Sequence, residues 1–159
     1  MKKIFLISLF LLINSLNLLA SDKRFSGKKL PRFASIKSLS INSRFGPSQT
    51  YPVKYIYNSK SQPVQIINEY YNWYQIKDVY GDTSWIYVNY IGKNDYATSI
   101  YDDTIIYAKA KPTSEIVAKV DKGVVFKIKG CKTFCKVETK FKGITFKGFI
   151  EKSDLWGVE

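Results

Sequence analysis

The segment Ser40–Val53 (SINSRFGPSQTYPV) constrains the fold more than any other part of the chain, because it contains two turn-forming pairs. Gly46-Pro47 follows a strand-like start, and Tyr51-Pro52 breaks the chain again. Glycine permits a positive φ, whereas proline fixes φ and removes a backbone donor. The segment therefore predicts a β-strand that turns sharply twice within a few residues.

Short β-segments follow this turn, and no stretch holds a helical period over three turns. The aromatic content of 16% also favours strands. Tyr71-Asn72 is a plausible hairpin turn between two of the segments. The strands expected in the first half are Phe33–Leu39, Val53–Tyr57, Val64–Tyr70, Trp73–Asp78 and Trp85–Tyr90. This spacing predicts an all-β fold, either a small barrel or a sandwich.

The second half of the chain repeats the pattern of the first. A weakly apolar junction, Gly92–Ser99, separates the two halves. The matching pairs, first half before second, are Pro52-Val53 with Ile116-Val117, Pro63–Asn68 with Gly123–Ile128, Trp73–Ile76 with Phe134–Val137, Trp85-Ile86 with Phe149-Ile150, and Tyr90-Ile91 with Asp154-Leu155. Two copies of one module, at residues 32–92 and 98–159, are therefore expected.

The N-terminal segment Met1–Ala20 has the layout of a secretory signal peptide. A lysine pair precedes the apolar run Ile4–Ile13, which is shorter than the roughly 20 residues that a spanning helix needs. Cleavage is predicted after Ala20, and an uncleaved anchor is the alternative because Leu18 is not small. We expect a periplasmic or secreted protein, with residues 21–31 as a flexible basic leader.

The net charge of +12 leaves two interpretations open. The lysines could form a functional basic face for peripheral association with anionic polymers or surfaces. They could equally reflect composition bias, since they are spread along the chain. Nucleic acid is not an expected partner of an exported protein, and the sequence does not indicate an oligomeric state.

The absence of histidine narrows the possible chemistry, because His-based triads and the usual zinc sites need it. The carboxylates Asp78, Asp82, Asp102 and Asp103 fall in or beside predicted turns, where turn chemistry explains them. We therefore expect no enzyme activity, no catalytic residues, no cofactor and no metal site.

Cys131 and Cys135 are the only cysteines, and three residues separate them. This spacing allows a tight hairpin in which the two residues face each other, with Cα atoms about 4.5 Å apart. That separation lies at the lower edge of the range for a disulfide. An oxidising compartment would favour the bond, so a disulfide is predicted, with two buried thiols as the alternative.

Strand alternation in Trp73–Ile76 places Tyr74 and Ile76 on one face and Trp73 and Gln75 on the other. If the isoleucine face is the core, Trp73 faces outward or lines a groove.

Aromatic residues are the best binding candidates in the sequence. Tyr55, Tyr57 and Tyr71 could join Trp73 in a shelf for an extended peptide or a sugar. Alternatively, these rings close the ends of a barrel too small to bury them. Arg44 could bind a carboxylate, or equally make a structural contact to a nearby carbonyl. Trp85 is expected in the core.

The motifs, in this order, resemble the bacterial SH3-like (SH3b) family, in particular its secreted tandem members. They are Asn42-x-Arg44-x-Gly46-Pro47, Tyr51-Pro52-Val53, Pro63-Val64, Trp73, Trp85-Ile86 and the ending Leu155-Trp156-Gly157-Val158. The resemblance covers Arg32 to Val158. It implies two tandem SH3-like β-barrels and a non-catalytic module that binds cell-wall peptide or an envelope protein. A structural scaffold without a ligand groove is the alternative.

The second copy departs from the family pattern at two places. It has Lys109–Pro112 in place of the Arg-x-Gly-Pro motif and Phe149 in place of the second tryptophan. A ligand site is therefore expected in the first copy rather than in the second.

Overall fold

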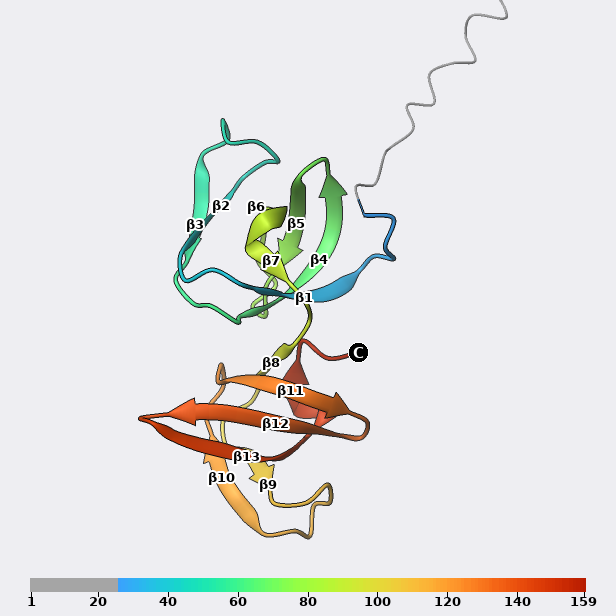
Figure 1. Ribbon diagram of the computed structural model, residues 1–159, viewed down its shortest axis with the longest axis vertical. Coiled ribbons are helices and arrows are strands. Elements are labelled where there is room, and N and C mark those ends of the chain that lie inside the picture. The colour runs from blue at the N-terminus through green and yellow to red at the C-terminus, as the bar shows by residue number, and fades with distance from the viewer. Residues whose placement is uncertain (1–25) are drawn as a thin grey trace, which may run out of the picture.

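A computed structural model describes residues 26–159, which form two seven-stranded antiparallel β-sheets (Figure 1). The all-β fold class is therefore confirmed. The predicted signal peptide, residues 1–20, and the first residues of the predicted leader lie outside the described part of the chain.

The first sheet contains the strands of residues 32–92 in the order β3-β2-β6-β5-β4-β1-β7. A single 3₁₀ turn, η1 (Val88–Tyr90), precedes its last strand. The strands are β1 (Arg32–Ile36), β2 (Ile41–Arg44), β3 (Val53–Tyr57), β4 (Pro63–Tyr70), β5 (Trp73–Lys77), β6 (Thr83–Tyr87) and β7 (Ile91–Gly92).

The second sheet has the same succession of neighbours, β10-β9-β13-β12-β11-β8-β14. A 3₁₀ turn, η2 (Lys152–Asp154), again precedes the last strand. The strands are β8 (Tyr96–Ser99), β9 (Thr104–Tyr107), β10 (Ile116–Val120), β11 (Val125–Cys131), β12 (Phe134–Phe141), β13 (Ile144–Glu151) and β14 (Leu155–Trp156).

The turns predicted in the first half are confirmed. The loop of residues 45–52 joins β2 to β3, which pair with Ile41 opposite Tyr57. Tyr71-Asn72 joins β4 to β5, with Tyr70 opposite Trp73. The φ of +47° at Tyr71 is typical of a tight hairpin turn.

The sequence analysis missed the short strands β7 and β8, and it assigned Val88–Tyr90 to a strand although these residues form η1. Tyr96–Ser99, which lies inside the stretch taken as the junction, is β8 and pairs with both β11 and β14. Its Ala97, Thr98 and Ser99 are buried, because β8 lies between two neighbours of the second sheet.

Each sheet encloses its own apolar core. Alternation along the strands directs aliphatic side chains inward, and Ile76 and Ile86 are fully buried in the first sheet. The first core consists of Ala34, Ile36, Ile41, Tyr57, Val64, Ile66, Ile76 and Ile86. The second consists of Ala97, Ile106, Phe126, Cys135, Val137, Ile150 and Leu155.

The C-terminal residues connect the two sheets, and the C-terminus lies at their junction (Figure 1). The rings of Phe33 and Trp156 meet edge to face, with centroids 5.1 Å apart. Gly157 has a φ of +108°, and a Cβ there would lie 2.9 Å from the Cβ of Pro63 and 2.9 Å from the carbonyl oxygen of Tyr96. Only glycine fits this backbone conformation and this close approach without strain.

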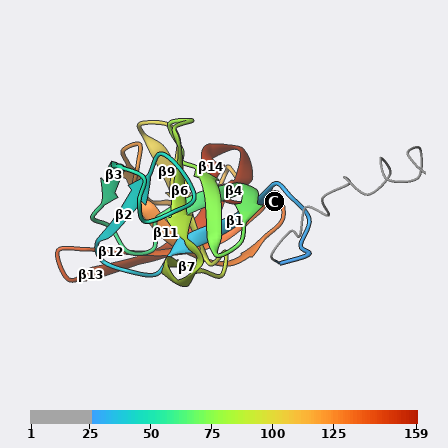
Figure 2. The same ribbon diagram turned by 90° about the horizontal axis from the view of Figure 1, so that it is seen from above.

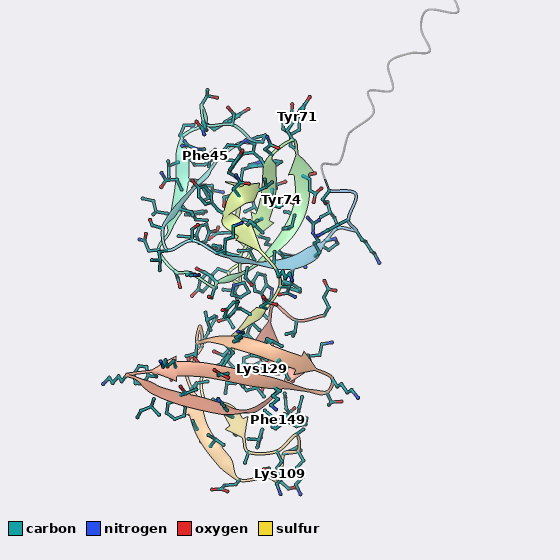
Figure 3. The ribbon with its side chains drawn as sticks, viewed as in Figure 1. Phe45, Tyr71, Tyr74, Lys109, Lys129 and Phe149 are labelled. Atoms are coloured by element: carbon teal, nitrogen blue, oxygen red, sulfur yellow. A yellow bond between two sulfur atoms is a disulfide. The ribbon has the colours of Figure 1, made fainter. Side chains whose placement is uncertain are left out.

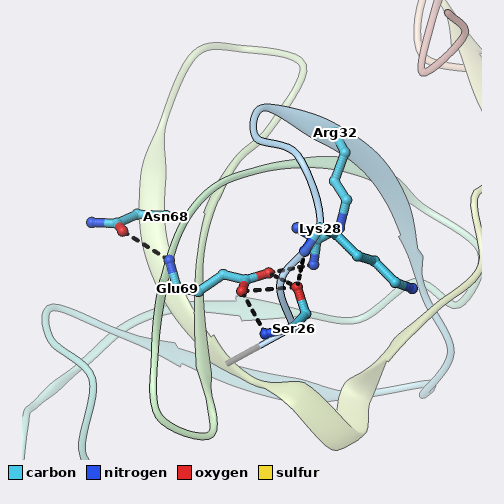
Figure 4. Close-up of polar contacts among 5 residues, drawn as sticks. All are labelled: Ser26, Lys28, Arg32, Asn68 and Glu69. Atoms are coloured by element: carbon cyan, nitrogen blue, oxygen red, sulfur yellow. Dashed lines mark hydrogen bonds and ion pairs between the residues drawn. The ribbon is translucent and has the colours of Figure 1, made fainter. Parts of the chain in front are cut away.

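A buried carboxylate holds the start of the described chain against β4 (Figure 4). Glu69, whose side chain is fully buried, accepts hydrogen bonds from the backbone N–H of Ser26 at 3.0 Å and from its hydroxyl at 2.7 Å. The guanidinium of Arg32 completes the cluster as an ion pair. Burial by itself would raise the pKa of Glu69, but the bonds from Ser26 and Arg32 outweigh it and hold the pKa below its ordinary value.

The predicted disulfide is present. Cys131 and Cys135 are opposite partners at the end of the β11–β12 hairpin, and the structure joins them.

Replacing Glu69 with glutamine should make the free energy of unfolding vary less with pH in the acid range. Because its folded pKa is depressed, the carboxylate stabilises the fold fully above its unfolded pKa of about 4.3, and this contribution is lost as the pH falls through the folded value. Glu69→Gln should lower the free energy of unfolding by about 2 kcal/mol at neutral pH and by much less in acid. Urea unfolding at several pH values measures this. Glu138→Gln, at a glutamate paired with exposed lysines, is the control, and an equal loss there would contradict the interpretation.

Gly157→Ala should destabilise the protein more than Gly123→Ala. Both glycines have positive φ, at +108° and +90°, so both substitutions introduce backbone strain of about 1–2 kcal/mol. A Cβ at Gly123 meets nothing within 4 Å, whereas one at Gly157 meets Pro63 and Tyr96. The two variants should therefore differ in the free energy of unfolding, measured with denaturant. This difference reports how much the close packing at the junction between the sheets contributes to stability. Equal effects would mean that the junction contributes no stability.

Candidate functional site

A groove of about 330 Å³ opens on the first sheet. It is bordered by β2 and the loop that follows it, by the start of β5, by the end of β6 and by η1. Its lining residues are Ser40, Ile41, Asn42, Arg44, Gln49, Trp73, Tyr87 and Tyr90.

Aromatic rings form one wall of the groove. Trp73 on β5 is the direct partner of Tyr87 on β6, and their rings meet edge to face with centroids 5.6 Å apart. Tyr87 in turn contacts Tyr90 of η1 at 6.3 Å. A backbone hydrogen bond of 3.0 Å from the N–H of Val88 to the carbonyl of Asn72 holds η1 against the start of β5. The three rings therefore form one continuous, pre-organised surface.

Polar side chains form the other wall. Arg44 donates from Nη1 to the carbonyl oxygen of Tyr51 at 2.7 Å, which ties the base of the 45–52 loop to β2. Its other guanidinium nitrogens make no hydrogen bond to any residue within 26–159. Asn42 and Gln49 are exposed, and none of the lining residues carries a carboxylate. The wall therefore offers a cation and two amides to a ligand.

The structure brings two of the predicted site residues together. Arg44 and Trp73 both line the groove, although Trp73 keeps only 9% of its surface exposed. Trp73 is therefore the buried part of the aromatic wall, and Tyr90, 40% exposed, offers the more accessible ring.

The other three predicted residues lie elsewhere, so the shelf expected around Trp73 does not form. Tyr57 is part of the core, and Tyr55 is partly buried against it. Tyr71 is 70% exposed at the tip of the β4–β5 hairpin, where its ring contacts Tyr70 (Figure 3). The physical reason is that β3 directs Tyr57 inward, while the turn at Tyr71 directs its ring away from the sheet.

Six groove residues were not predicted as site residues from the sequence: Ser40, Ile41, Asn42, Gln49, Tyr87 and Tyr90. A signal for Tyr87 was present, because alternation with Ile86 facing the core places Trp85 and Tyr87 on the outer face. For the same reason the expectation that Trp85 lies in the core is wrong, since it is half-buried and pairs with Gln75 and Arg44 on that face.

The corresponding region of the second sheet has different side chains. Phe134 contacts Tyr107 with ring centroids 6.0 Å apart, and Phe149 pairs with Tyr107. Figure 3 shows Phe149 near β9, and Lys109 in the β9–β10 loop. These aromatic residues adjoin a shallow surface lined by Lys132 and Lys136 rather than by an arginine.

The turn carboxylates support backbone structure. Asp78 Oδ1 accepts hydrogen bonds from the N–H groups of Tyr80 and Asp82, each at 3.0 Å, and Asp102 accepts one from the N–H of Lys122 at 3.0 Å.

Within residues 26–159 no group of three or more histidine, cysteine or acidic side chains could hold a metal ion. In the same part of the chain no helix has the length and apolar character to cross a bilayer.

Tyr57 should titrate as a buried residue. Burial, assisted by the nearby Asp78 carboxylate, raises the pKa of Tyr57 to about 12, although the neighbouring Ser84 hydroxyl opposes the shift. Since the neutral form is favoured in the folded state, its stabilising contribution is complete below the unfolded pKa of about 10 and is lost as the pH rises toward 12. Ultraviolet titration should show a late tyrosine step that disappears in Tyr57→Phe. An unchanged titration curve in that variant would contradict the burial of Tyr57.

Comparison with known proteins gives a partial match. Residues 37–91 match the family described as "Bacterial SH3 domain", and this range includes every residue that lines the groove. No curated protein matches.

Two solved structures from Trichomonas vaginalis are similar at low identity. NlpC2 is 13% identical, with a TM-score of 0.36, and the match covers 82% of this chain and 49% of that one. NlpC1 is 16% identical, with a TM-score of 0.34, and the match covers 83% of this chain and 48% of that one. The chain thus spans about half the length of either structure. On the family match, residues 37–91 are a bacterial SH3 domain, which confirms the predicted resemblance for this part of the chain.

Proposed function

We propose that this protein is an exported, non-catalytic binding module whose first SH3-like unit recognises a short peptide of the cell wall or of an envelope protein. The observation that carries the proposal is the groove itself, in which an aromatic wall faces an arginine and two amides. SH3 domains bind extended peptides in aromatic-lined grooves, so this surface has the general form of a peptide site.

The groove chemistry favours a ligand that carries a carboxylate. The guanidinium of Arg44 can form paired hydrogen bonds to such a group, and no lining carboxylate would repel it. The rings of Tyr87 and Tyr90 offer edges and faces to apolar or Cα–H surface, while Asn42 and Gln49 can bond a peptide backbone. A short peptide with a carboxylate and apolar side chains would offer all these groups.

The second unit is proposed to be another SH3-like barrel. Its sheet repeats the strand order of the first, including the 3₁₀ turn before the last strand. We assign it no peptide groove, because Tyr107 pairs with Phe149 where the first unit pairs Arg44 with Trp85, so the arginine is missing.

Export and the lack of catalysis are parts of the proposal that rest on the sequence. Residues 1–20 have the layout of a signal peptide, and the chain contains no histidine. The hydrogen bonds of Asp78 and Asp102 to turn N–H groups give these carboxylates a structural role.

Binding to peptidoglycan tests the groove. Residues 21–159 should co-sediment with purified peptidoglycan, and Tyr90→Ala should weaken binding about tenfold, as expected for an interfacial aromatic anchor. Tyr71→Ala is the matched control, because Tyr71 is more exposed than Tyr90 yet lies outside the groove. It should bind like the unchanged protein.

The salt dependence of binding distinguishes binding in the groove from attraction by the dispersed lysine charge. The assay is repeated at about 1 M salt, where charges are screened over about 3 Å. Binding that persists there and is lost only in Tyr90→Ala supports the groove. Binding that disappears with salt in every variant would assign it to the lysines. No binding at low or high salt would contradict a wall ligand and favour the scaffold alternative.

A further inference from the structure

The β12–β13 hairpin of the second unit is longer than its counterpart in the first. β12 and β13 each have eight residues, whereas β5 and β6 have five each. The hairpin turns through Lys142-Gly143, both with positive φ, and its tip extends beyond the rest of the second sheet (Figure 1). Seen from above, it also projects past the first sheet (Figure 2). The extra length therefore presents the tip to solvent rather than to the core.

The tip carries two exposed apolar side chains. Phe141 is 63% exposed and Ile144 is 62% exposed. They are direct partners in the hairpin, so their side chains lie on the same face of it. Exposed apolar side chains that stand together indicate an interaction surface.

The apolar surface continues from the tip toward the body of the second unit. Phe141 and Phe146 border a cleft of about 250 Å³ together with Val120 and Val124 of the facing segment. Phe146 is half-buried against the second core. The hairpin therefore rests on the unit through Phe146 and leaves Phe141 and Ile144 free.

Lysines surround this apolar tip. Lys140 and Lys142 flank Phe141, both are exposed, and Lys119 lines the cleft. The ammonium of Lys142 lies 5.4 Å from the centre of the Phe141 ring.

The nearest acidic groups do not cancel this charge. Glu138 is paired with Lys129, and Lys147 lies 3.9 Å from it. Asp121 also lines the cleft, and it is the one acidic residue among the lining residues. Around the tip itself, the charge is positive.

We propose that the β12–β13 tip docks on an anionic phospholipid surface, with Phe141 and Ile144 entering the interfacial region and Lys140 and Lys142 meeting the headgroups. Apolar side chains beside lysines are the combination that binds such interfaces, and each basic residue near the surface adds to the attraction. Lysine stems can lie along the acyl boundary while their ammonium groups remain at the phosphates.

The size of the tip favours a bilayer over a protein partner. A stable protein interface buries about 800 Å² on each partner, far more than two side chains at one turn provide. A lipid interface accepts a small apolar wedge and needs no matching surface. The docking surface belongs to the second unit and does not depend on the peptide groove of the first.

Vesicle co-sedimentation tests the proposal. Residues 21–159, which contain both sheets, are mixed with vesicles of phosphatidylcholine alone or of phosphatidylcholine with phosphatidylglycerol. The protein should bind only the anionic vesicles. The double variant Phe141→Ser with Ile144→Ser should bind at least about tenfold more weakly, since the tip loses its apolar contact. Lys140→Gln with Lys142→Gln should lose about fivefold for each lysine.

Phe45→Ser is the matched control. Phe45 is 61% exposed and has the ammonium of Lys54 at 5.4 Å from its ring centre, as Lys142 has at Phe141. It stands on the first unit, in the loop after β2 (Figure 3). Its replacement should leave vesicle binding unchanged. Circular dichroism checks that every variant is folded, which is expected because all the changed residues are exposed.

The outcomes are distinct. Loss of anionic-vesicle binding in the tip variants, with Phe45→Ser unaffected, supports the proposal. Binding that depends on salt but not on Phe141 and Ile144 would overturn it in favour of dispersed lysine charge. Equal binding to both kinds of vesicle, or no binding to either, would also overturn it. None of these results affects the peptidoglycan assay, so the two proposals fail or stand separately.

Discussion

Antiparallel pairing of β5 with β6 is the constraint on which both the first core and the groove depend. Because side chains alternate between the faces of a strand, the register that buries Ile76 and Ile86 also directs Trp73 and Tyr87 to the opposite face, where they are direct partners. A slip of one residue would exchange the two sets and expose the isoleucines. The burial of the core therefore fixes the position of the aromatic wall.

The sequence predicted the features that local chemistry controls. The Gly46-Pro47 turn and the Tyr71-Asn72 hairpin could be read directly, because their residues favour particular backbone angles. The β8 strand could not, since Tyr96–Ser99 is short and its partners are far away in the chain. The groove was predicted only in part for the same reason. Trp73 and Arg44 stood out individually, but Tyr90 meets them only after η1 folds back over β5.

The two sheets show that one strand order can present different surfaces. In the first unit, the connection between β5 and β6 is a compact turn held by Asp78, and the proposed peptide site lies in the groove. In the second unit, the corresponding connection is the extended hairpin with Phe141 and Ile144 at its tip. The core positions change little in character, because both cores need aliphatic side chains at the inward sites. Variation is therefore concentrated at turns and strand ends, where it disturbs no core packing.

The junction between the sheets bears on how the two proposed surfaces would act together. The edge-to-face contact of Phe33 with Trp156 and the close approach of Gly157 to Pro63 connect the units through side chains and backbone, not only through the linking segment. Two weak sites on one chain strengthen each other when the connection allows both to be occupied, because binding at one raises the effective concentration at the other. A junction of this kind restricts the relative positions of the groove and the hairpin tip. Combined binding would therefore depend on the spacing between the wall ligand and the lipid surface. Two units joined only by a flexible linker would tolerate a wider range of spacings.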